Sequence, residues 1–212
     1  VPEVMRGLDA VDGYAYVAAS SGGLIVVDAR DPSAPSLASI TRIDGASASD
    51  VQVAREIAFV AAGRGGLRAY GLRDAYSPRL LGNTAVAGGA SSIVVDGWNA
   101  YVCHDALHVI DVWDPSRLAE RGFVDLPHGA SDIDVMAGHA YVAGFVGGLS
   151  VVGVRYPSAP EVIATVTTPG SALDVVVADG YAFVADAQAL RERAPQLADE
   201  LRRRLAREVP PT

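Results

Sequence analysis

The chain has 212 residues, half of them hydrophobic and only 20 % charged, with a formal net charge of −8. This composition supports a buried core and excludes a disordered chain. The acidic balance argues against a nucleic-acid-binding protein, which needs clustered Lys and Arg, and no stretch reaches the roughly 18 uninterrupted apolar residues of a membrane span.

The first residues and the cysteine content add little about where the protein works. Residues 1–7 show no charged start followed by an apolar run, so we expect no signal peptide in this chain. Cys103 is the single cysteine and has no internal disulfide partner, so it does not indicate a redox compartment.

One unit of about 42 residues recurs along most of the chain. It is aligned on an aromatic residue that follows a short β-branched run and a turn, and the successive spacings are 43, 42, 40 and 42 residues: Tyr16, Phe59, Tyr101, Tyr141 and Phe183. The units run over about 5–47, 48–89, 90–129, 130–171 and 172–186. Regular recurrence at this period is typical of repeat proteins. We expect all five anchors to be largely buried between units.

Each full unit predicts four antiparallel strands. The first is short, as in 132–136, and a turn separates it from the second strand, which contains the anchor. Gly-Gly-Leu opens the third strand in three of the units, and a proline-rich corner leads to a fourth: 37–42, 80–85, 118–124 and 162–167. Four strands per unit favour an all-β β-propeller of about five blades over a parallel β-solenoid, whose coils are shorter.

The third strands carry a family resemblance. The segment 24–28 (LIVVD) with the corner 31–35 (DPSAP) resembles the LVIVD repeat, and so does 107–111 (LHVID). The resemblance covers roughly residues 8–186, and Gly71 and Gly153 depart from it where the motif has aspartate. It implies a β-propeller, often on exported or surface proteins of bacteria and archaea, and no single activity. An extracellular or cell-surface location follows from this resemblance.

The repeat pattern changes after Asp186. Apolar residues in 187–208 recur at spacings of four, three, four and four, which predicts a helical tail over 187–212 in place of the third strand of the last blade. The first five residues resemble 159–163, which lead into a fourth strand, so we expect them to pair with the incomplete blade. The tail or the open blade edge can pack on the chain itself, giving a monomer, or on a second copy, giving a homodimer.

Three aspartates are the first candidate site. Asp50, Asp132 and Asp174 begin innermost strands, with Ser92 and Gly7 at the equivalent places, so a closed ring brings them together at one channel mouth. They can bind a cation such as calcium, or a basic ligand. The competing interpretation, which we favour, is that each caps the turn before its strand, because recurrence in successive units indicates a structural role.

Two tryptophans are the second candidate site. Trp98 lies at a hairpin tip and Trp113 at a strand end, where large aromatic residues are exposed and can contact a ligand. Cys103 precedes a histidine, but it occupies an alanine position of the repeat, and neighbours on a tight hairpin point apart. The four histidines lack zinc-ligand spacing.

These features support two functional hypotheses. The favoured one is a non-catalytic scaffold or recognition module that binds a protein or small ligand at the loops and channel mouth. The alternative is an enzyme with its site in the central funnel, using the inward aspartates or a bound cation. Fold alone does not separate them.

Overall fold

The computed structural model describes residues 4–187 and 189–192, and the regular elements in these residues are all β-strands. In chain order they are β1 (Gly7–Val11), β2 (Tyr14–Ala18), β3 (Leu24–Asp28), β4 (Ser36–Thr41), β5 (Asp50–Ala54), β6 (Ile57–Ala61), β7 (Leu67–Gly71), β8 (Arg79–Thr84), β9 (Ser92–Asp96), β10 (Asn99–Cys103), β11 (Ala106–Asp111), β12 (Ala119–Asp125), β13 (Asp132–Met136), β14 (His139–Ala143), β15 (Leu149–Gly153), β16 (Glu161–Val166), β17 (Ala172–Ala178), β18 (Tyr181–Asp186) and β19 (Ala189–Glu192).

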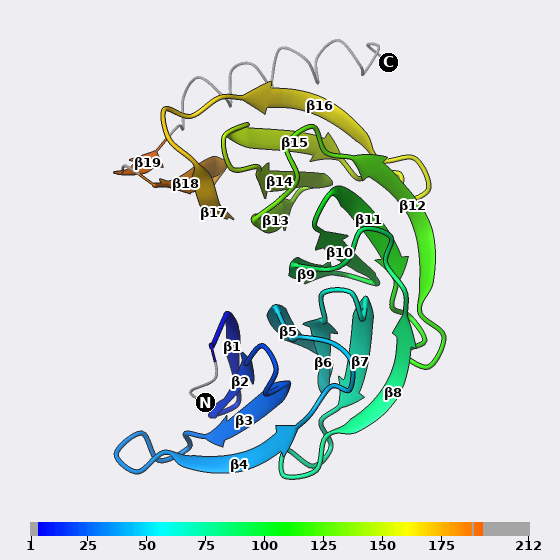
Figure 1. Ribbon diagram of the computed structural model, residues 1–212, viewed down its shortest axis with the longest axis vertical. Coiled ribbons are helices and arrows are strands. Elements are labelled where there is room, and N and C mark those ends of the chain that lie inside the picture. The colour runs from blue at the N-terminus through cyan, green and yellow to red at the C-terminus, as the bar shows by residue number, and fades with distance from the viewer. Residues whose placement is uncertain (1–3, 188, 193–212) are drawn as a thin grey trace.

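The strands form five antiparallel sheets, each made from consecutive strands. Sheet 1 is β1–β4, sheet 2 is β5–β8, sheet 3 is β9–β12, sheet 4 is β13–β16, and sheet 5 is β17–β19. The first strand of each sheet lies on the inside of an open arc and the fourth lies on the outside (Figure 1). The predicted four-stranded unit is therefore confirmed for sheets 1–4.

Two local features recur in the complete sheets and explain their shape. The pairing of the third and fourth strands shifts register at one point in each sheet, as between Val26 and Val27. Such bulges bend the outer strand. The Gly-Gly turns need glycine: a Cβ on Gly23, which has a φ of 81°, would lie 2.2 Å from the carbonyl oxygen of Thr41.

In the part of the chain that the structure describes, the core consists of four apolar clusters, one at each contact between neighbouring sheets. The inner strands β1, β5, β9, β13 and β17 lie next to one another in that order. A single sheet has two apolar faces, and stacking against its neighbours buries them. Across the opening of the arc, sheets 1 and 5 face each other without a sheet between them in the described residues (Figure 1).

The prediction for the last unit was wrong at residues 189–192. They form β19, which pairs with β18 in the register Ala185↔Leu190, where we expected the start of a helix. The free edge of β18 offers backbone partners for a third strand, and pairing satisfies them. The rest of the predicted tail, residues 193–212, lies outside the described residues.

The prediction that all five anchors are largely buried is only partly right. Tyr16, Phe59 and Tyr101 are buried, whereas Tyr141 and Phe183 are only half-buried. Each anchor faces the next sheet along the chain, so its burial depends on how well that sheet covers it. Within the described residues no sheet comes after sheet 5, and Phe183 keeps part of its ring in solvent.

The expected closure by the N-terminal residues is not seen in the part of the chain that is described. Val4 and Met5 are exposed and belong to no strand, and residues 1–3 lie outside the described residues. The described residues also contain no helix long and apolar enough to cross a membrane.

Candidate functional site

The sheets have two different ends, and the candidate residues divide between them. The glycine-loop face carries the turns between second and third strands, the connections between sheets and the starts of the inner strands. The proline-corner face carries the hairpin turns between first and second strands and the corners between third and fourth strands. Asp50, Asp132 and Asp174 lie at the first face, and Trp98 and Trp113 lie at the second. The five residues therefore do not form one site.

The aspartates at the glycine-loop face join neighbouring sheets. The Ile93 backbone N–H in sheet 3 donates to Oδ2 of Asp50 at 2.9 Å, and the Val175 N–H in sheet 5 donates to Oδ2 of Asp132 at 3.0 Å. The Ser92 hydroxyl lies between the two carboxylates, 3.1 Å from Asp50 and 2.9 Å from Asp132. Asp50 and Asp132 therefore have a structural role, in which they accept hydrogen bonds from the next sheet. Asp174 of sheet 5 is exposed.

A second row of side chains makes the same contact two residues further along. The Val53 N–H donates to Oδ2 of Asp9 at 2.7 Å, and the Val177 N–H donates to Oδ2 of Asp134 at 2.7 Å. Gln52 accepts from the following sheet in the same way. The inner strands are thus connected by side-chain acceptors of one sheet and backbone donors of the next.

Burial changes the proton affinity of these carboxyl groups. Loss of solvent raises the pKa of Asp132 to about 7, and the adjacent Asp174 carboxyl adds to this. Loss of solvent also raises the pKa of Asp50, although three hydrogen bonds oppose it. Within the described residues, no group of three or more His, Cys, Asp or Glu side chains is arranged to hold a metal ion.

The tryptophans at the proline-corner face form one cluster with an arginine of the neighbouring sheet. The rings of Trp98 and Trp113 meet edge to face, with centroids 4.4 Å apart. The Arg55 guanidinium lies 4.2 Å from the centroid of Trp98 and donates to the carbonyl oxygen of Gly97. Trp98 remains 46 % exposed and Trp113 remains 65 % exposed. The predicted contact residues therefore come together as an exposed, positioned aromatic pair, which we call the tryptophan cluster.

Other exposed aromatic residues share the proline-corner face. They project from the hairpin turns and corners of sheets 2, 4 and 5: Tyr76, Tyr156 and Tyr181. The Tyr76 hydroxyl donates to Asp28 of sheet 1 at 2.7 Å, and the same carboxylate pairs with Arg30 at 2.6 Å. The corners of sheets 1 and 2 are therefore tied together, as Arg55 ties sheets 2 and 3.

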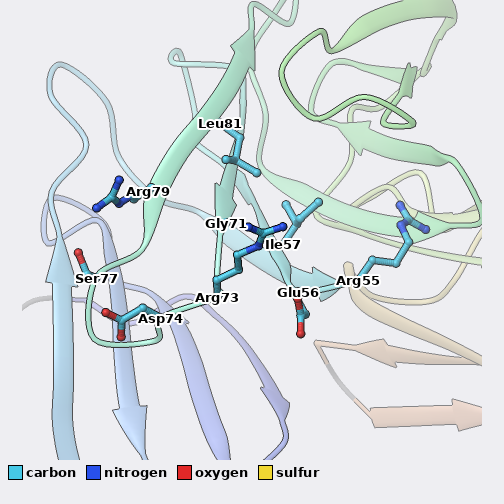
Figure 2. A pocket seen from close by; sticks show the side chains of 9 residues that line it. All are labelled: Arg55, Glu56, Ile57, Gly71, Arg73, Asp74, Ser77, Arg79 and Leu81. Carbon is cyan, nitrogen blue, oxygen red and sulfur yellow. The ribbon is translucent and has the colours of Figure 1, made fainter.

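A cavity of about 560 Å³ opens on the same face, at the corner of sheet 2 (Figure 2). It is lined by three arginines, two acids, two large aliphatic residues, a serine and a glycine: Arg55, Arg73, Arg79, Glu56, Asp74, Ile57, Leu81, Ser77 and Gly71. Because Arg55 also lies over Trp98, the cavity adjoins the tryptophan cluster. Sequence reasoning missed this cavity, although the departure at Gly71 was visible.

The repeats match a known family model over most of their length. The LVIVD repeat matches residues 6–42, 87–125, 128–168 and 169–190, which together are more than half of the chain. The chain belongs to the LVIVD-repeat family. The unmatched interval between the first two LVIVD segments, residues 43–86, contains all four strands of sheet 2.

Solved structures show which fold the LVIVD repeats build here. The designed protein Ika8 aligns with a TM-score of 0.68 at 9 % identity, over 87 % of this chain and 56 % of that one. BamB from Moraxella catarrhalis aligns with a TM-score of 0.62 at 16 % identity, over 88 % and 57 %. The chain thus spans just over half the length of these two. A nidogen/laminin complex aligns with a TM-score of 0.65 at 14 % identity, over 93 % and 78 %.

These likenesses show the fold alone. The LVIVD repeats of this chain form the blades of a β-propeller, and the fifth blade is incomplete, with three strands in the described residues. No curated protein matches the sequence significantly.

The Cys103 thiol is not accessible to solvent. Its side chain is fully buried, and burial raises the pKa of its thiol far above the usual value. The neighbouring His104 is directed toward Asp105, 3.8 Å away, at the exposed end of the hairpin. The residue packs as a small apolar side chain, as its alanine position predicts.

Proposed function

We propose that this protein is a non-catalytic β-propeller binding module that presents its proline-corner face to a partner protein. The observation that carries the proposal is the tryptophan cluster, in which Trp98 and Trp113 stay exposed while Arg55 holds them in position. Large aromatic residues and arginine dominate the energetics of protein interfaces. An aromatic pair that is already fixed loses little conformational entropy on binding.

The fate of the inner aspartates supports binding over catalysis. Asp50 and Asp132, which the catalytic alternative uses in the central funnel, already accept hydrogen bonds from the following sheets. A general acid or base must reach the substrate, and these oxygens are engaged in the framework. The complex of nidogen with laminin illustrates a protein of related fold that binds another protein. We also propose that the protein is extracellular or located at the cell surface, because proteins with LVIVD repeats are often exported.

A displayed library of random twelve-residue peptides tests the proposal without a known partner. We expect selection on the intact protein to enrich peptides whose affinity falls by at least about tenfold on Trp113→Ala, and similarly on Trp98→Ala, because truncated interface tryptophans lose roughly 2 kcal/mol or more. Affinity is measured by biolayer interferometry.

The matched control is Val146→Ala on the glycine-loop face, where Val146 is 73 % exposed. The control should leave affinity unchanged. Enriched peptides that bind the tryptophan variants as tightly as the intact protein, or that lose affinity on Val146→Ala, would overturn the assignment of the face.

A further inference from the structure

The four complete sheets allow an internal comparison at the proline corner. In sheets 1 and 3 the third strand ends in the aspartate of the family motif, and that carboxylate neutralises an arginine: Asp28 pairs with Arg30 at 2.6 Å, and Asp111 pairs with Arg121. The same carboxylates accept the backbone N–H groups of Arg30 and Trp113 at 3.1 Å and 2.9 Å. The motif aspartate therefore both caps the corner and balances a cation.

Sheet 2 keeps one cation of this arrangement, lacks the carboxylate and adds a second cation. Gly71 stands at the aspartate position, and Arg73 stands where Arg30 stands in sheet 1. Arg79 lies directly across from Gly71 in the fourth strand. Within the described residues, neither Arg73 nor Arg79 takes part in an ion pair, and both are exposed.

Sheet 4 shows that the loss of the aspartate alone does not create this imbalance. It also has glycine at the position, Gly153, but Glu161 lies across from it where sheet 2 has Arg79. Among the complete sheets, sheet 2 therefore combines a missing carboxylate with two arginines. It is also the unit that the family model leaves largely unmatched.

The cavity borders the position of the missing side chain. A Cβ on Gly71 would meet the methyl groups of Leu81 at 3.3 Å, and both residues line the cavity. In Figure 2, Arg73 extends from the corner toward Gly71 and Ile57. The three arginines exceed the two lining acids by one charge, and Asp74 already accepts the Tyr76 backbone N–H at 2.9 Å.

We propose that this cavity binds a carboxylate group, which takes the place of the motif aspartate beside Arg73. Guanidinium groups bind carboxylates through paired, charge-assisted hydrogen bonds. Ile57 and Leu81 supply an apolar wall, so the site favours a carboxylate carried on a short aliphatic chain over a small inorganic anion. Both a free aliphatic acid and a glutamate side chain of a partner protein have this chemistry. The inference rests on the proposed function, because it gives a ligand class to the same face.

The test uses the full chain and two probes, hexanoate and the capped peptide Ala-Glu-Ala. In an NMR titration we expect at least one probe to bind saturably and to shift the Gly71 amide, with no response to 1-hexanol or to Ala-Gln-Ala. Hexanoate binding alone identifies a free acid as the source, and peptide binding identifies a protein side chain. Absence of binding by both, or equally tight binding of sulfate, would overturn the proposal.

Two variants and one control locate the site. Arg73→Gln should weaken binding by about tenfold, because a hydrogen bond to a charged group is lost. Gly71→Asp should abolish binding, because it restores the motif carboxylate, which takes the ligand's place beside Arg73. Arg155→Gln, at the equivalent corner of sheet 4, should change nothing. Binding that survives Gly71→Asp, or that Arg155→Gln weakens equally, would contradict the site.

The outcomes separate this inference from the proposed function. Peptides that depend on Trp113, found together with no carboxylate binding, would leave the binding module intact and remove only the cavity as its ligand site. Carboxylate binding that depends on Arg73, found with peptides indifferent to both tryptophans, would keep the cavity and refute the tryptophan cluster as the protein-binding surface.

Discussion

The interface between sheets 2 and 3 and the interface between sheets 4 and 5 use the same repeat positions with different results. At the first, the anchor Phe59 is fully buried. At the second, the equivalent Tyr141 is half-buried against the adjoining cluster. Sheet 5 has no following sheet in the described residues, and its side chains are less covered still. Phe183 is only half-buried, and Val176, which stands at the repeat position of Asp134 and Gln52, is 56 % exposed.

This difference shows that equivalent positions in the repeat do not contribute equally to stability. The residue type is set by the unit, but burial and hydrogen bonding are set by the neighbouring unit. Stability in this protein should therefore decrease from the interior interfaces toward sheet 5, although the sequence of each unit is similar.

The largest expected effect is at the interior anchor. Phe59→Ala should lower the free energy of unfolding by about 3–5 kcal/mol, because it leaves a cavity in a closed core. Phe183→Ala should lower it by less than about 2 kcal/mol, because part of that ring is already in solvent. Denaturant unfolding measures both. Equal losses would show that another part of the full chain covers the outer face of sheet 5.

The hydrogen bonds between inner strands should show an intermediate effect. Asp134→Ala removes the acceptor for the Val177 N–H and should cost about 1–2 kcal/mol, since the donor is left without its charged partner. Val176→Ala changes the same repeat position in sheet 5 and should cost less than about 0.5 kcal/mol, as at most exposed sites. If the two variants unfold alike, the side-chain acceptors do not stabilise the contact between sheets.

A further expected effect is one of pH dependence. The folded-state pKa of Asp132 is raised to about 7, above the unfolded value near 3.9, so the folded state favours the protonated form. Its contribution to stability is present below about pH 4 and is lost as the pH rises through about 7. Asp132→Asn cannot ionise and keeps an oxygen acceptor for the Val175 N–H.

The melting temperature of wild type relative to Asp132→Asn should therefore fall as the pH is raised from 4 to 8 (roughly, the interval between the two pKa values). Asp179→Asn, in an exposed turn, is the control, and its melting temperature should change with pH in the same way as that of wild type. A wild-type advantage that grows with pH would contradict the assigned direction of the shift.

Much of the fold was predictable because the signals are local. The β-branched runs, glycine turns and proline corners of sheets 1–4 each indicate a strand or its end within a few residues. The third strand of sheet 5 was missed because residues 189–192 sit inside a longer apolar stripe of helical period. Four residues cannot show a strand period of their own, and the pairing edge of β18 decides the outcome.

The site was less predictable because its partners lie in other units. The recurrence of Asp50 and Asp132 indicated a structural role, but their partners are backbone N–H groups, which leave no signature in the sequence. The tryptophans were found from exposure signals, whereas their contact with Arg55 depends on the approach of sheets 2 and 3. The departure from the motif at Gly71 could be seen in the sequence. That it leaves an arginine without a carboxylate partner follows only from the structure, by comparison with Asp28 and Arg30.

The contacts between inner strands also have a direction along the chain. Where the described residues bring a backbone N–H of one inner strand to a side chain of another, the acceptor belongs to the earlier sheet and the donor to the later one, as with Asp9 and Val53. During synthesis, a newly emerged inner strand therefore finds its acceptors already in place on the preceding sheet. Because the ribosome synthesises the earlier sheet first, each new sheet can dock on the one before it. The arc can therefore assemble sheet by sheet during synthesis.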